Sequence, residues 1–407
     1  MKQINGGVCA PKGFRAGGIW CGIKAASKKR DLALIYSEKP CAAAGIFTQN
    51  LVKAASVLVS QKHLSHGTLR AIIANSGNAN ACTGEAGMAA ARKMAELAAD
   101  LFAINLAEVA VASTGVIGVP LPIGAIENSI EALGNSLGAD AAGSDAALEA
   151  IMTTDTRKKD GAVEIEINGK PVRIGAMVKG SGMIHINMAT MLGFITTDAA
   201  ISHELLDKAL RRAAGHSFNR VTVDGDTSTN DTLIIMASGE AGNSPINTAG
   251  ADYEIFAEAL ESLCVKLAKS MARDGEGATK LLAVTVTGAA DEKSAEKLAM
   301  SAASSSLVKA AVFGADANWG RVLCAFGYSG VVFDPNAADV SFCSKAGRVK
   351  VCENGAGLQF SETEAKKILL DDEIEINASV GSGEGKATVW GCDLTYDYVK
   401  INGDYRS

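Results

Sequence analysis

Strand-like and helix-like runs follow one another along this chain, and that alternation restricts its fold more than any other feature. The runs 163–167 and 172–176 alternate apolar and polar residues on either side of Asn168-Gly169, a dipeptide typical of a two-residue hairpin turn. Between residues 253 and 272, apolar side chains recur at the spacing of one helix face. Because the two kinds of element are mixed throughout, the sequence predicts an α/β or α+β fold.

The same patterns predict further elements on both sides of this region. Beyond about residue 328, short β-rich runs, the first at 331–333, surround one helix near 362–370, which indicates a smaller α+β module. Elsewhere we expect strands at 32–36, 56–60, 69–74, 108–113 and 281–287, and helices at 85–101, 123–137, 145–152, 204–214 and 295–312.

The composition argues against several classes of protein. With 407 residues, of which 48% are hydrophobic, the chain can bury the cores of two or three domains. Its net charge of −6 and its lack of a long basic run argue against a nucleic-acid partner. No apolar stretch approaches the roughly 20 residues of a membrane span, so we expect no membrane association. The nine cysteines are scattered and lack C-x-x-C spacing, so we expect no disulfides, as fits a cytoplasmic protein. The five histidines lack H-x-x-x-H spacing, so we expect no metal site.

Two stretches imitate ligand-binding motifs without having their spacing. Residues 381–386, GSGEGK, match neither of the common phosphate-binding loops and predict a glycine-rich turn. Asp224-Gly225-Asp226 lacks the glutamate that would complete a calcium loop. Neither stretch therefore predicts a cofactor.

Residues 179–199, KGSGMIHINMATMLGFITTDA, form the arrangement with the clearest chemical potential. Small and polar residues around Thr190 lie between apolar ones, a composition typical of a buried strand that follows a turn. A threonine that is itself N-terminal is a useful nucleophile, because its own amine, with a pKa of about 7.7–8.0, can accept the hydroxyl proton. Thr190 reaches that state only if the Ala189–Thr190 bond is cleaved. The residues alone leave both interpretations open.

This segment resembles the signature of the ornithine acetyltransferase (ArgJ-type) family, the glutamate N-acetyltransferases of arginine biosynthesis, whose pattern reads approximately KGSGMIAPNMATML. Further stretches match the same family in the same order over nearly the whole chain, and together they are far more specific than any one alone. They are residues 47–50, 75–80, 113–118, 152–156, 274–280, 318–321 and 402–407. The resemblance implies a layered α/β sandwich of the DmpA/ArgJ-like type with a smaller C-terminal α+β module.

The resemblance also implies self-cleavage and a set of site residues. Cleavage before Thr190 gives an alpha chain, 1–189, and a beta chain, 190–407, in which 190–327 complete the main α/β body and 328–407 form the smaller module. Thr114 and the backbone N–H of Gly115 are the implied oxyanion hole, a pair of donors that stabilises a developing negative charge. The implied substrate-binding residues are Thr153, Lys179, Thr190, Glu276, Asn402 and Ser407.

The reaction that this resemblance implies is a ping-pong transfer. N-acetylornithine gives its acetyl group to Thr190, ornithine leaves, and glutamate takes the acetyl group to become N-acetylglutamate. Acetyl-CoA is a possible second donor, and no metal or organic cofactor is needed. The family implies a heterotetramer of two alpha and two beta chains.

Two other functions stay open at this stage. The same processed threonine would serve a hydrolase, such as an aminopeptidase or amidohydrolase, if water took the acyl group. A non-catalytic binding protein would keep the fold without cleaving, although the intact set of site residues disfavours it. One departure from the family pattern stands just upstream of Thr190, where His185-Ile186 replace the usual Ala-Pro. It is either a tolerated loop variation or a sign that His185 assists proton transfer or alters the acyl donor.

Overall fold

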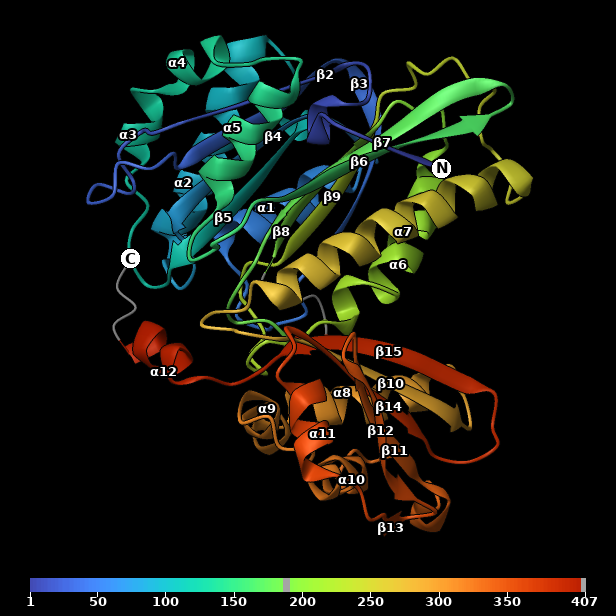
Figure 1. The fold of residues 1–407 in the computed structure, drawn as a ribbon. Helices are drawn as coiled ribbons and strands as arrows, with labels where there is room; N and C mark the ends of the chain where they lie inside the picture. Colours follow the sequence, from blue (N-terminus) through green and yellow to red (C-terminus); the bar gives the residue numbers. More distant parts are fainter. Residues whose placement is uncertain (186–190, 404–407) are drawn as a thin grey trace.

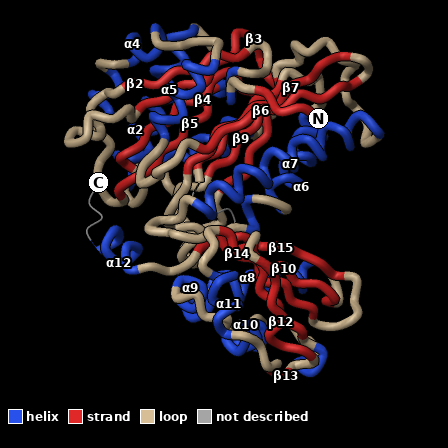
Figure 2. Tube along the Cα trace, in the orientation of Figure 1, coloured by secondary structure: helices blue, strands red, loops and turns tan. Residues whose placement is uncertain are grey.

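The computed structural model describes residues 1–185 and 191–403 (Figure 1). Three of the predicted site residues, Ala189, Thr190 and Ser407, therefore lie outside the described residues. The described chain forms two bodies, each built on its own sheet, and Figure 2 shows strands and helices mixed in both. The mixed α/β class predicted from the sequence is confirmed.

Nine strands of the described residues form the larger sheet, in the order β1-β6-β7-β8-β9-β3-β4-β5, with β2 also paired to β3. Most neighbours are antiparallel, and the pairs β4–β5 and β8–β9 are parallel. The strands are β1 (Lys2–Ile4), β2 (Phe14–Ile19), β3 (Leu32–Phe47), β4 (Thr68–Asn78), β5 (Val109–Val116), β6 (Lys159–Ile167), β7 (Lys170–Lys179), β8 (Leu192–Thr197) and β9 (Thr232–Ala237).

Alternating side chains on these strands create a layered sandwich. In β9, Leu233 and Ile235 face one core and Ile234 and Met236 face another, as the two-residue period of a strand requires. The first core lies under α6 (His203–Gly215) and α7 (Ala251–Arg273). The second lies between the two halves of the sheet, β7–β9 and β2–β5, together with α5 (Ala141–Ile151). The outer face of β3–β5 is covered by α1 (Ala55–Leu64), α2 (Gly84–Phe102), α3 (Ile123–Glu127) and α4 (Ile130–Asn135).

The second sheet has the order β13-β12-β11-β14-β10-β15 and lies below the first in Figure 1. One face packs on α8 (Glu292–Ser304), α9 (Ser306–Phe313) and α10 (Trp319–Gly327), with α11 (Glu362–Leu369) beside β11. Its strands are β10 (Leu281–Ala289), β11 (Asp339–Ser344), β12 (Gly347–Glu353), β13 (Ala356–Gly357), β14 (Glu373–Ser379) and β15 (Gly385–Cys392). After β15 the chain returns towards the larger body as α12 (Tyr396–Gly403).

The predicted start of the smaller module, residue 328, is not where its sheet begins. Strand β10 starts at Leu281 and lies between β14 and β15, so 281–327 belong with the second sheet rather than with the main body. The short β-rich runs that begin near 328 instead mark the point at which the helices α8, α9 and α10 end and the remaining strands of the second sheet follow. A boundary set by strand pairing over about 90 residues leaves no local trace in the sequence.

Several predicted elements are confirmed and two are wrong. The hairpin of β6 and β7 turns at Asn168 and Gly169, with φ values of 53° and 71°, and α7 covers the predicted long helix. The predicted strand 56–60 is instead part of α1. Its Ser60 and His63 side chains hydrogen-bond to backbone groups of β5, a tertiary contact that no local pattern reveals. The β-rich run 331–333 forms no strand.

Among the described residues, four short 3-10 helices connect these elements: η1 (Gly7–Cys9), η2 (Leu106–Glu108), η3 (Phe218–Arg220) and η4 (Pro335–Ala337). Over 1–185 and 191–403, no helix is both long enough and apolar enough to cross a membrane.

Candidate active site

Thr114 and Gly115 lie on β5 where it runs closely beside β4. Gly115 has a φ of 135°, which L side chains rarely adopt, and a Cβ there would overlap the backbone of Gly77 and Asn78. Only glycine therefore allows the two strands this approach. The Oγ1 atom of Thr114 accepts a hydrogen bond from the Lys179 ammonium at 3.1 Å, so the threonine hydroxyl keeps its own proton available to donate.

Lys179 is the last residue of β7, and its side chain is buried. Burial lowers the pKa of this ammonium, because a charge is less stable away from water. The carboxylates of Asp155, Glu276 and Asp231 oppose that shift, whereas the neighbouring ammonium of Lys159 adds to it. The charge of Lys179 therefore depends strongly on these neighbouring groups.

Glu276 follows α7 and is held on both sides. Its Oε1 accepts from the Thr154 hydroxyl at 2.7 Å, and its Oε2 accepts from the Asn402 side-chain amide at 2.9 Å. A Cβ at Gly182 would overlap the Glu276 carboxylate, so a glycine there lets the segment after β7 pass close beside it. Asn402 comes from α12, which brings the C-terminal part of the chain to the larger body.

These residues share one cavity of about 250 Å³. All of the predicted site residues within 1–185 and 191–403 line it: Thr114, Gly115, Thr153, Lys179, Glu276 and Asn402. They come from five separate stretches of the chain. The structure therefore brings together every described member of the predicted set, while the roles assigned to them stay predictions.

Four polar residues that line the same cavity were missed: Thr154, Ser228, Thr229 and Asn230. The Asn230 side-chain amide donates to the carbonyls of Ala79 and Ser113, both at 2.7 Å, and so holds the chain next to Thr114. The available signal in the sequence was a run of small polar residues directly before the buried strand β9. Such a run is equally typical of an ordinary loop, so it does not by itself predict a site.

The residue that follows Thr190 is anchored by a buried carboxyl group. Met191 donates its backbone N–H to Oδ1 of Asp231 at 3.0 Å, at the entry to β8. Burial raises the pKa of Asp231 well above its usual value, even though the Met191 N–H and the Lys179 charge act in the other direction. Within the part of the chain that the structure describes, its other oxygen has no hydrogen-bond partner.

His185 does not line the cavity. Its Nδ1 lies 3.2 Å from the hydroxyl of Thr222, and burial lowers the pKa of the imidazole while Asp224 and Asp226 oppose that shift. The neutral ring is thus favoured. Its suggested part in proton transfer stays a prediction.

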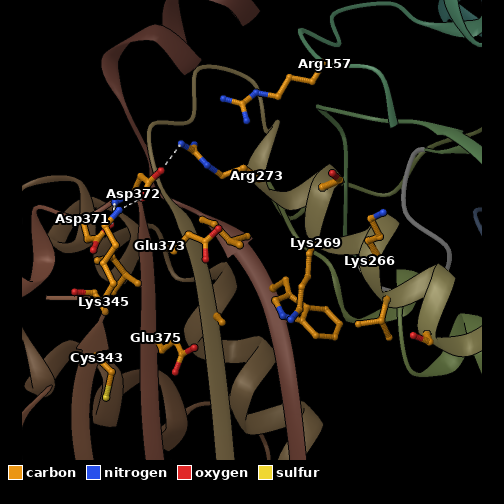
Figure 3. A pocket seen from close by; sticks show the side chains of 18 residues that line it. Arg157, Lys266, Lys269, Arg273, Cys343, Lys345, Asp371, Asp372, Glu373 and Glu375 are labelled. Carbon is orange, nitrogen blue, oxygen red and sulfur yellow. Dashed lines mark hydrogen bonds and ion pairs between the residues drawn. The ribbon is translucent and has the colours of Figure 1, made fainter. Parts of the chain in front are cut away.

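A larger cleft, of about 1050 Å³, lies between α7 and the second sheet (Figure 3). Four of its five cations lie along one side: Arg157, Lys266, Lys269 and Arg273. The fifth, Lys345, lies with the four carboxylates on the side of the second sheet: Asp371, Asp372, Glu373 and Glu375. None of the predicted site residues within the described ranges lines this cleft, so its size does not make it the candidate site. Among the described residues, no group of three or more His, Cys, Asp or Glu side chains is placed to hold a metal ion.

Comparison with known proteins identifies the family of this chain. A family model described as the ArgJ family matches residues 15–407. The arginine biosynthesis bifunctional protein ArgJ of Symbiobacterium thermophilum is 53% identical over 408 residues, which is 100% of both chains, and ArgJ 1 of Clostridium acetobutylicum is 52% identical over 394 residues, 97% of this chain and 96% of that one. A crystal structure of ArgJ from Bacillus halodurans, 46% identical with a TM-score of 0.50, covers 52% of this chain and 98% of its own. The chain belongs to the ArgJ family.

Proposed function

We propose that this chain is a self-processing glutamate N-acetyltransferase of arginine biosynthesis that moves an acetyl group from N-acetylornithine to glutamate. Family membership supports an acetyltransferase of that pathway. The observation that carries the proposal is the convergence of an ammonium, a carboxylate and a Thr-Gly pair on one small cavity. A volume of about 250 Å³ suits an acylated amino acid better than a peptide.

Processing at the Ala189–Thr190 bond is the first step of the proposal. The Thr190 hydroxyl attacks the Ala189 carbonyl, the peptide becomes an ester, and water hydrolyses that ester to free the Thr190 amine. One comparison supports two separate pieces. The Bacillus halodurans chain matches over 98% of its own length but over only 52% of this chain, so it is about half as long.

Acetyl transfer then uses the groups around the cavity. The Thr190 amine takes the proton of its own hydroxyl, and the oxygen attacks the amide carbonyl of N-acetylornithine. The carbonyl oxygen develops a negative charge and accepts hydrogen bonds from the Thr114 hydroxyl and the Gly115 N–H. A donor of this kind is worth roughly 3–4 kcal/mol of the barrier. Acetyl-Thr190 forms, ornithine leaves with the proton, and the amine of glutamate later takes the acetyl group.

Lys179 and Glu276 suit the two charged ends of an amino acid. In the proposal, the buried Lys179 ammonium attracts the substrate carboxylate and the Glu276 carboxylate pairs with the substrate amine, while Thr153 and Asn402 complete the binding surface. Acetyl-CoA is proposed as a second acetyl donor, in keeping with the word bifunctional in the relatives' names. Independence from metals and cofactors, a cytoplasmic location and an assembly of two copies of each fragment are further parts of the proposal.

Two measurements test the proposal. On a denaturing gel the protein should run as two fragments, the first 189 residues and the remaining 218, whereas Thr190→Ala should run as one band. With N-acetylornithine, the wild type should form N-acetylglutamate only when glutamate is present. Release of acetate at the same rate with or without glutamate would instead identify a hydrolase. An active enzyme that stays in one piece would overturn the processing step.

A further inference from the structure

We propose that a buried ion-pair network of Asp155, Lys159 and Asp274 positions the candidate site, by fixing the Thr153, Lys179 and Glu276 segments relative to one another. None of the three network side chains lines the cavity. The inference deepens the proposed function and rests on it for its activity readout.

Asp155 joins the first two of these segments. Its Oδ2 accepts the backbone N–H of Thr153 at 3.0 Å, and its Oδ1 accepts the backbone N–H of Gly180 at 2.8 Å. Thr153 lines the cavity, and Gly180 directly follows Lys179. One carboxylate therefore sets the distance between the loop that carries Thr153 and the end of β7.

Lys159 and Asp274 add the third segment. The Lys159 ammonium lies 2.7 Å from Asp155 Oδ1 and 2.5 Å from Asp274 Oδ2. Asp274 also accepts the backbone N–H groups of Thr156 and Arg157, at 3.1 and 3.2 Å. Two residues later the chain reaches Glu276, so the end of α7 is held against the loop that carries Thr153.

The network is buried, unlike an ordinary surface ion pair. The side chains of Asp155 and Lys159 are fully buried, and that of Asp274 is 2% exposed. Removing three charges from water costs several kcal/mol for each ion, and apolar side chains of similar size often stabilise a fold equally well. A directional network whose carboxylates accept four backbone N–H groups fits a need for exact placement better than a need for stability.

The network also influences the charge of the site. It holds two carboxylates and one ammonium, and the charges of Asp155 and Lys159 both act on the buried Lys179. Although burial opposes its ionisation, the charges of Lys179 and Lys159 hold the pKa of Asp155 at about 2. Loss of the Asp155 charge would therefore lower the pKa of Lys179 further, whereas loss of the Lys159 charge would raise it.

The network spans the proposed cleavage point. Asp155 and Lys159 precede Thr190 in the sequence, and Asp274 follows it. After cleavage, the Lys159–Asp155 pair would lie within the first fragment, and the Lys159–Asp274 pair would link the two fragments. Both pairs lie next to the site that the fragments would share.

The test compares Asp155→Asn and Lys159→Gln with a control, Asp145→Asn. Asp145 lies on α5 and forms an exposed pair with Lys158 at 2.5 Å, so the control removes the same kind of charge away from the site. Two properties are measured for each protein: kcat and KM for acetyl transfer as a function of pH, and the rate at which acetic anhydride labels Lys179, followed by mass spectrometry. Labelling reports the free amine and needs no turnover.

Asp155→Asn should lower kcat/KM by about 100-fold, as expected when reacting groups shift by about 1 Å. It should also move the basic limb of the pH profile, and the pH at which Lys179 becomes reactive, down by at least about one unit. Lys159→Gln should move both in the opposite direction, which simple loss of structure would not do. The control should stay within about twofold of wild type.

The inference is overturned if either network variant folds and Lys179 is labelled with the wild-type pH dependence. If Asp155→Asn does not fold, Lys159→Gln decides the matter through the sign of its shift. If the wild type transfers no acetyl group but the labelling shifts occur as expected, the proposed function fails while the positioning role stands.

Discussion

Replacing Gly115 by alanine tests the proposed oxyanion hole through backbone geometry alone. The new Cβ would lie 2.8 Å from the Cα of Gly77 and closer still to the next backbone atoms, whereas ordinary contact begins near 3.4 Å. Strands β4 and β5 must therefore separate by at least about 0.6 Å at this point. Because both are backbone segments inside a sheet, no flexible side chain can absorb the displacement.

The expected losses follow from that displacement. In the proposed mechanism, moving the Gly115 N–H out of line removes a transition-state interaction worth roughly 3–4 kcal/mol, so kcat should fall about 100- to 1000-fold. The unfavourable φ and the overpacking each cost about 1–3 kcal/mol of folding free energy. The assay pairs initial rates of N-acetylglutamate formation with urea unfolding of the same samples.

Gly118 provides the matched control. It lies three residues further on with a φ of 80°, but a Cβ there has open space around it. Gly118→Ala should cost about 1–2 kcal/mol of stability from its backbone conformation and leave kcat unchanged. Wild-type kcat in a folded Gly115→Ala enzyme, or an equal fall in kcat for both variants, would refute the reasoning.

Three other substitutions give independent checks. Burial raises the pKa of Asp231, so ionisation of this carboxyl group disfavours the folded state. The free energy of unfolding should therefore fall as pH rises from the unfolded pKa near 4 towards the raised folded value. Asp231→Asn should remove this dependence, measured by urea unfolding at pH 5 and pH 8. Ser60→Ala leaves the N–H and C=O of Val111 without their partner and should lower the free energy of unfolding by about 1–3 kcal/mol. An unchanged free energy of unfolding would show that water replaces the hydroxyl. Asn402→Ala frees one oxygen of Glu276 and should raise KM more than it lowers kcat; an unchanged KM would argue against substrate binding there.

Local patterns predicted the elements whose stability is local. The β6–β7 hairpin needs only its turn dipeptide and its alternation, and α7 needs only one apolar face. The run that became α1 has valines that suit a strand equally well, and its contacts with β5 decide the outcome. The second sheet could not be delimited, because β10 finds its partners about 90 residues later.

The candidate site shows the same division. Six residues carried by the family resemblance meet in one cavity, although no periodicity joins Thr114 to Glu276. Asn230 was missed because its contribution is a pair of hydrogen bonds to backbone carbonyls distant in the sequence. The role of Asp155 cannot be predicted from the sequence for a related reason: its partners are backbone N–H groups, and only the folded chain shows which ones.

The order of strands in the larger sheet has a consequence for how the protein must be made. Strand β8 comes after Thr190 but pairs with β7, and β9, also after it, pairs with β3. A fragment ending at residue 189 and produced alone would therefore present β7 and β3 as bare edges, which invite aggregation. If the chain is cut before Thr190 as proposed, the two fragments would share the middle of one sheet and could not separate without breaking the β7–β8 and β3–β9 pairings. Folding of the uncut chain before cleavage would keep both of these edges covered at every stage.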